Sequence, residues 1–207
     1  MAIQAVLTGD IVNSTRLGQA VEKKLLRGLQ QLLAGHRFEF YRGDSFQVYV
    51  KNAGTALQTA LLCRTAAISI AGNAATVSSD IRISIGIGKV KPPPTGLGAA
   101  KGEAFVLSGR AFDEITKKDI RLAIASTNEL ANEGLQVIAD YINSIFKMMT
   151  GKQAGVIFEL LKGETQQAVA VKLKKSKSTI NQHVNAGRWP EIEKLVEHYQ
   201  NIINQLL

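Results

Sequence analysis

The chain has 207 residues, of which 45% are hydrophobic and 20% are charged, so it can bury a core and is neither a disordered nor a fibrous protein. No apolar stretch approaches about 18 residues, and the first residues lack the basic and apolar regions of a signal peptide, so we expect no membrane span and a cytoplasmic location. A formal net charge of +8 favours an anionic partner, either nucleic acid or the phosphates of a nucleotide.

The first part of the chain begins with a strand and a helix. Residues 3–10 form an apolar run typical of a buried strand. Two β-rich runs at 36–51 meet at residues 42–45, a sequence typical of a hairpin turn. Between the first strand and this hairpin, residues 16–33 have the spacing of an amphipathic helix, with apolar positions at Leu17, Val21, Leu25, Leu29 and Leu32.

The following segments continue this alternation. An Ala- and Leu-rich helix is expected at 53–71; it holds the single cysteine, Cys63, which alone forms neither a disulfide framework nor a zinc site. Alternating isoleucines predict a strand at 80–90. Three successive prolines make residues 91–103 a loop, because proline interrupts helices and strand pairing alike. The remaining elements of this part are a helix at about 108–118 and a strand at 121–126.

The order of these segments predicts an α+β fold, a ferredoxin-like βαββαβ sandwich in which helices pack against a mainly antiparallel sheet. From about residue 127 the pattern changes to helices only. We therefore expect a first domain at 1–126, a connecting helix at 127–150 and a helical segment at 151–207.

Two aspartates stand where the first strand and the hairpin end. On this layout these strands are neighbours, so Asp10 can face Asp44. Two close carboxylates repel each other unless a cation such as Mg²⁺ bridges them, and Mg²⁺ prefers one or two carboxylates plus phosphate oxygens. The alternative is that Asp10 caps a turn and Asp44 is an ordinary hairpin residue, and spacing alone leaves both open.

A nucleotide site is expected beside these aspartates. Asn13, Ser14 and Thr15 begin a helix whose exposed N–H groups can receive phosphates. Gly43, in the hairpin turn, is a further position that we expect to contact the nucleotide.

Four segments of residues 1–126 resemble, in the correct order, motifs of the class III nucleotide cyclases: VLTGDIVNSTRL, YRGDSFQVYV, IRISIGIGKV and LSGRAFDEITK. The resemblance implies that Asp10 and Asp44 bind Mg²⁺ or Mn²⁺, assisted by the carbonyl of Ile11. The chain is also similar to the SatD-like bacterial proteins, which place such a domain before a DNA-binding segment.

Four positions depart from the cyclase pattern. Phe40 stands where purine-reading cyclases have a lysine, and Val106 where they have an acidic residue, so both base-reading positions are apolar. Asp113 replaces the transition-state asparagine and Lys117 the triphosphate-binding arginine; these two are the candidate catalytic residues. Asp113 would repel a triphosphate, and lost donors cost about a few kcal/mol of catalysis. We therefore expect a nucleotide-binding relative rather than an efficient cyclase.

Residues 165–188 resemble a bacterial helix-turn-helix. Thr165 can cap a helix at 166–173, and Ser176 can cap a second helix at 176–184 that matches the position of a recognition helix. Two lysines in the intervening turn replace the usual glycine and the apolar residue after it. The residues expected to contact DNA are Lys174, Lys175, Lys177, Ser178, Thr179, Gln182, His183 and Arg188. The alternative is a helical hairpin used for packing, with a basic solvated face.

A last helix begins at Trp189-Pro190 and carries an apolar stripe. The stripe is either an intramolecular packing face or a dimer seam, and a homodimer is expected.

Three functions fit this sequence. The favoured one is a DNA-binding transcriptional regulator whose degenerate cyclase-like domain senses a nucleotide or a metal. The alternative is an active metal-dependent nucleotide cyclase whose C-terminal helices dimerise it. The third is a scaffold that only binds other proteins.

Overall fold

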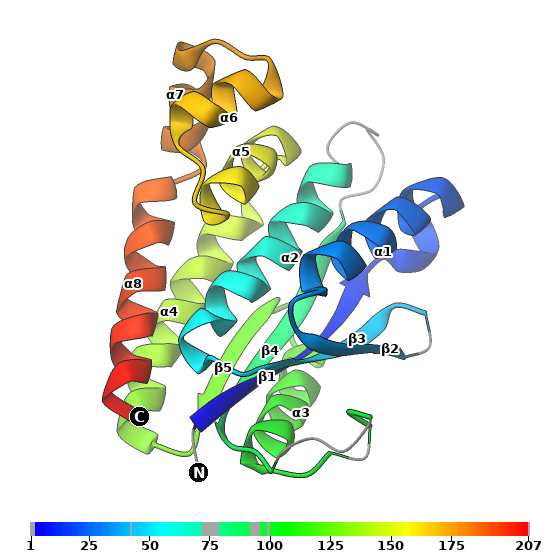
Figure 1. Ribbon diagram of the computed structural model, residues 1–207, viewed down its shortest axis with the longest axis vertical. Coiled ribbons are helices and arrows are strands. Elements are labelled where there is room, and N and C mark those ends of the chain that lie inside the picture. The colour runs from blue at the N-terminus through cyan, green and yellow to red at the C-terminus, as the bar shows by residue number, and fades with distance from the viewer. Residues whose placement is uncertain (1–2, 42, 72–78, 92–95, 99, 207) are drawn as a thin grey trace.

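The computed structural model describes residues 3–41, 43–71, 79–91, 96–98 and 100–206. These residues form an α+β fold, as predicted, with a five-stranded sheet covered by helices and a helical portion beyond it (Figure 1). Within these ranges no helix is both long and apolar enough to pass through a bilayer.

The strands lie in the order β2-β3-β1-β4-β5. β1 is central and pairs antiparallel with β3 and β4, whereas β4 and β5 are parallel. Alternation in β4 buries Ile81, Ile83 and Ile85 toward the larger core. The strands are β1 (Ile3–Val12), β2 (Arg37–Tyr41), β3 (Ser45–Val50), β4 (Asp80–Lys89) and β5 (Leu122–Ser126).

Helices cover both faces of this sheet. α1, α2 and α4 lie on one face, α3 lies on the other, and α6 and α7 extend beyond the sheet at one end (Figure 1). The described helices are η1 (Ser14–Arg16), α1 (Gln19–Leu33), η2 (Ala53–Thr55), α2 (Ala56–Ala71), α3 (Glu103–Thr116), α4 (Glu129–Lys147), α5 (Gly151–Leu161), α6 (Gln166–Leu173), α7 (Lys177–Ala186) and α8 (Trp189–Leu206).

Two predicted helix boundaries were wrong. α3 begins at Glu103 rather than near residue 108, because Glu103 accepts a hydrogen bond from the Lys89 amide (2.9 Å) and the first turn packs on β1 and β4. The helix predicted at 16–33 is broken before α1, and Leu17 lies between η1 and α1. Arg42, in the expected hairpin turn, lies outside the described residues, as do 92–95 and 99 of the expected proline loop.

One continuous core runs from β1 to α8. α5 packs on α2, where the Gln58 amide donates to the Leu161 carbonyl at 2.6 Å. In α8, the buried Tyr199 hydroxyl donates to the Ala53 carbonyl at 2.8 Å. The apolar stripe of the last helix is therefore an intramolecular packing face, and the division into parts at 127 and 151 stays a prediction.

A charged side chain also lies inside this core. Arg64 of α2 is only 1% exposed, and its guanidinium binds both carboxylate oxygens of Asp80 at 3.1 and 2.6 Å. Its guanidinium carbon lies 4.5 Å from the ring centre of Phe146 in α4. Arg64 therefore joins α2, the start of β4 and α4.

We expect Asp80→Asn to lower the free energy of unfolding by about 3 kcal/mol, because it leaves the buried Arg64 charge without its counter-ion. Urea unfolding followed by circular dichroism measures this loss. The matched control is Glu114→Gln, which breaks the exposed Lys117–Glu114 pair and should cost less than about 1 kcal/mol. Equal losses in the two variants would contradict the role given to Arg64.

Candidate functional site

Asp10 lies near the end of β1, opposite Arg82 of β4 in the strand register. Its Oδ2 accepts a hydrogen bond from Arg82 Nη1 at 3.1 Å, while its Oδ1 is buried and has no hydrogen-bond partner. The carboxylate thus meets a guanidinium that the sequence analysis did not anticipate. Only the pairing register of β1 with β4 brings these two side chains together.

Asp44 follows the hairpin turn and is joined to the start of η1. Ser14 Oγ donates to Asp44 Oδ2 at 2.7 Å, and the Ile11 amide donates to the Asp44 backbone carbonyl at 3.1 Å. Ser14 is buried, and Asn13 before it takes a left-handed conformation with φ of 60°. The chain therefore turns sharply at Asn13, and this turn holds Ser14 against Asp44.

The charges of the two aspartates interact. Burial raises the pKa of Asp10, Arg82 acts against this, and the negative charge of Asp44 raises the pKa further. Arg121, just before β5, also lowers it. The two carboxylates that we expected to bind metal therefore interact electrostatically at one end of the sheet.

The oxygens left over suit a divalent cation. Asp10 Oδ1 has no partner, and among the described residues the hydrogen bond that Asp44 Oδ1 accepts from Ser45 Oγ is a long one, 3.5 Å. In the described ranges no group of three His, Cys, Asp or Glu side chains gathers around a point. Two carboxylates without a third fit Mg²⁺ or Mn²⁺, which keep waters or phosphate oxygens as their other ligands.

The four positions that depart from the cyclase pattern lie on other elements. The Phe40 ring packs against Phe38 and Phe46, with centroids 5.9 and 5.5 Å away. On α3, Val106 is 49% exposed and Asp113 is exposed. Lys117 caps the end of α3 and pairs with Glu114 at 3.0 Å. Phe40 is therefore partly buried against the core, and Lys117 is paired with a residue of its own helix.

A second candidate site lies on the three helices α5, α6 and α7, which pack on one another. Thr165 caps α6 and Ser176 caps α7 through their side-chain oxygens, as predicted. Lys174, between the helices, takes the left-handed conformation with φ of 53°, which glycine adopts more readily. Lys174 therefore makes the tight turn that the usual glycine would make.

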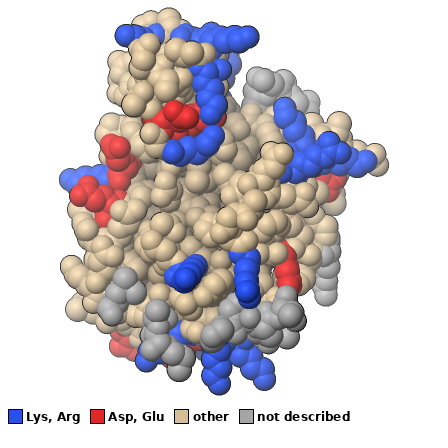
Figure 2. All heavy atoms as spheres, in the orientation of Figure 1, with Lys and Arg blue, Asp and Glu red and all other residues tan. Residues whose placement is uncertain are grey.

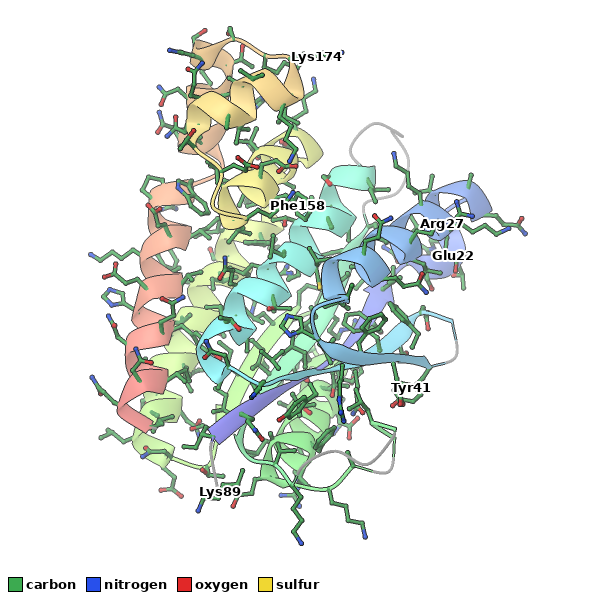
Figure 3. The ribbon with its side chains drawn as sticks, in the orientation of Figure 1. Glu22, Arg27, Tyr41, Lys89, Phe158 and Lys174 are labelled. Carbon is green, nitrogen blue, oxygen red and sulfur yellow. The ribbon has the colours of Figure 1, made fainter. Side chains whose placement is uncertain are left out.

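The outer face of α7 is polar and basic. Lys174, Lys175, Lys177, Ser178 and Gln182 are exposed, and Lys174 points away from the molecule at the tip of this unit (Figure 3). Lys and Arg side chains gather over the same end in Figure 2. No acidic residue occurs between 165 and 187.

Three of the residues expected to contact DNA are placed differently. Thr179 and His183 are half-buried, and the Thr179 hydroxyl lies 2.9 Å from Ser176 Oγ in the cap of α7. Arg188 binds Glu191 and the Tyr141 hydroxyl, the latter at 2.7 Å, so it joins α8 to α4. Asn181 and Asn185, which the sequence analysis missed, are exposed and continue the row of Ser178. The available signal was the helical spacing, since Asn181 is three residues after Ser178 and Asn185 is four residues after Asn181.

Comparisons with known proteins give only structural likenesses. No family model matches the chain, and no curated protein matches it. A bacterial light-regulated adenylyl cyclase is similar over 59% of this chain and 74% of its own, with 15% identity and a TM-score of 0.41. The active GGEEF domain of a Vibrio cholerae diguanylate cyclase is similar over 61% and 84%, with 13% identity and a TM-score of 0.40. We therefore argue function from the residues of this chain.

We expect Mn²⁺ to raise the melting temperature of the protein, because a cation bound between Asp10 and Asp44 relieves their repulsion and stabilises only the folded state. Asp44→Asn should abolish the increase, whereas Asp113→Asn, on exposed α3, should leave it unchanged. Differential scanning fluorimetry with and without EDTA measures the shift. An increase that survives Asp44→Asn would place the cation elsewhere.

Proposed function

We propose that this protein is a DNA-binding regulator whose cyclase-like domain binds a nucleotide together with Mg²⁺ or Mn²⁺. The observation that carries the proposal is the exposed basic surface at the start of α7, in a stretch, 165–187, whose sequence holds no acidic residue. Lysine ammonium groups there suit DNA phosphates, which supply most of the affinity of such contacts.

The arrangement of the helices supports insertion of α7 into a major groove. α7 contacts both α5 and α6, and its inner side chains Ile180 and Val184 are buried. Its opposite face presents Ser178, Asn181 and Gln182, whose polar ends can meet base edges. We place the phosphate contacts at the start of α7, on Lys174, Lys175 and Lys177. Arg188 is left out of this interface because it is engaged with Tyr141 and Glu191.

The aspartate pair supports a sensor role. Asp10 and Asp44 retain oxygens for a cation, and the cation would supply charge neutralisation for phosphates near Asn13, Ser14 and Thr15. Phe40 and Val106 offer no hydrogen-bond donor or acceptor in their side chains for a base. Arg82 already neutralises part of the charge on Asp10. Together these features favour binding of a nucleotide over its turnover.

A dimer fits a DNA site with two half-sites. The large apolar side chains Leu130, Val137 and Met148 are 83%, 66% and 80% exposed, and their spacing aligns them along α4. We place the contact between protomers on this row.

An active cyclase remains the second candidate function, favoured by the unpaired Oδ1 of Asp10 and the weakly bound Oδ1 of Asp44.

We expect Lys175→Ala combined with Lys177→Ala to weaken binding to all DNA sequences and to reduce the slope of log affinity against log salt by about 2. Fluorescence anisotropy with genomic fragments at low and physiological salt measures both quantities. The matched control is Lys23→Ala combined with Lys24→Ala, which removes the same charge from exposed positions of α1. Gln182→Ala should reduce discrimination between sequences by about 1–3 kcal/mol.

Equal losses in the two double variants would show a general charge effect and contradict an interface on α7. Absence of DNA binding by the unaltered protein would leave α6 and α7 as packing elements.

We expect little cyclic product from each nucleoside triphosphate with Mn²⁺, because Phe40, Val106 and Asp113 do not provide the expected donors. Chromatographic detection of cyclic nucleotides measures the turnover. Robust turnover that disappears in Asp10→Ala would favour the cyclase.

A further inference from the structure

A cavity of about 450 Å³ lies at the strand ends, beside the aspartate pair. Its walls come from the end of β1, the start of β4, the residues before β5, α2 and the last turns of α4. Its polar and charged lining residues include Arg64, Ser79, Asp80, Arg121, Asn143 and Lys147.

Four of these side chains have a buried polar atom without a hydrogen-bond partner: Arg64 Nη1, Ser79 Oγ, Arg121 Nη1 and Asn143 Oδ1. Arg64 and Ser79 are 1% and 2% exposed. Buried polar atoms normally find a partner, because leaving them unpaired is costly. All four residues line this one cavity from separate elements, so a ligand bound there is the partner that we infer for these atoms.

The unpaired atoms specify the chemistry of this ligand. Two guanidinium N–H groups and a hydroxyl can donate to an anion, and arginine is well suited to phosphate oxygens. The amide nitrogen of Asn143 already donates to the Leu122 carbonyl at 2.8 Å, and its Oδ1, which is an acceptor, is the atom left without a partner. The ligand thus needs an anionic group near the arginines and a hydrogen-bond donor near Asn143.

The charges around the cavity leave a net positive balance. Asp80 pairs with Arg64 and Asp119 pairs with Arg121, while Lys147 adds a third cation at the exposed end of α4. Apolar atoms of Phe146 and Ile68 supply a surface for a flat, less polar part of the ligand. A volume of about 450 Å³ accommodates a nucleoside monophosphate.

We propose that this cavity binds a small phosphate ester of nucleoside monophosphate size, held directly by arginine and without a metal ion. The site differs from the aspartate pair in its ligands, which are donors from α2, the residues before β5 and α4. Arg121 lines the cavity, and its charge also lowers the pKa of Asp10. The proposal depends neither on DNA binding nor on the metal site.

Isothermal titration of the full chain in EDTA tests the proposal, with 5′-AMP and 5′-GMP as probes and inorganic phosphate and adenosine for comparison. We expect at least one nucleotide to bind, phosphate to bind more weakly, and adenosine to show no binding. Arg121→Gln combined with Lys147→Ala should weaken nucleotide binding by roughly tenfold or more, because charged hydrogen bonds are lost. Arg64 is left in place because it holds the fold together.

Two controls separate this site from the others. Arg110→Gln combined with Lys101→Ala removes the same charge from exposed positions in and just before α3 and should leave the affinity unchanged. Asp10→Asn should also leave it within about threefold. No nucleotide binding at about 1 mM, or phosphate binding that a nucleoside does not improve, would overturn the proposal. Loss of binding in Asp10→Asn would place the nucleotide at the aspartate pair instead. The proposal would also be overturned if Arg121→Gln combined with Lys147→Ala left the nucleotide affinity unchanged.

Discussion

The fold depends on keeping one guanidinium charged inside an apolar core. Arg64 is almost fully buried, and Asp80 and the face of Phe146 are its compensating neighbours. A buried charge without a partner is far more costly than an absent one, so α2, the start of β4 and α4 must be positioned together. The same arrangement leaves Arg64 Nη1 without a hydrogen-bond partner in a residue that lines the cavity, which is why we propose an anion there.

Opposite charges recur across the neighbouring strand ends. Asp10 meets Arg82 across β1 and β4, and Arg121 pairs with Asp119 just before β5. A cation entering between Asp10 and Asp44 has to compete with the Arg82 guanidinium for part of the Asp10 charge. In the proposed function, the Arg82 pair therefore lowers the affinity of the aspartate pair for a cation.

Local patterns predicted much of this fold, and long-range register decided the rest. The alternating isoleucines of β4 and the cap residues Thr165 and Ser176 depend on neighbours a few residues away, so they were found from the sequence. Arg82 was missed because only the β1–β4 register sets it opposite Asp10. Arg188 was assigned to DNA because its partner Tyr141 lies 47 residues away in the chain. The cavity combines residues from five segments, which no single stretch reveals.

The hydrogen bond of Tyr199 to Ala53 has a mechanical consequence for the helices α5 to α7. They follow α4 and precede α8 in the chain; α4 packs on β5, and Tyr199 fixes α8 to η2. A module on one flexible tether swings freely, whereas this one is clamped at both of its ends. A displacement of α4 would therefore act on α5 to α7 and on α8 at the same time, and the packing of α5 on α2 would resist it.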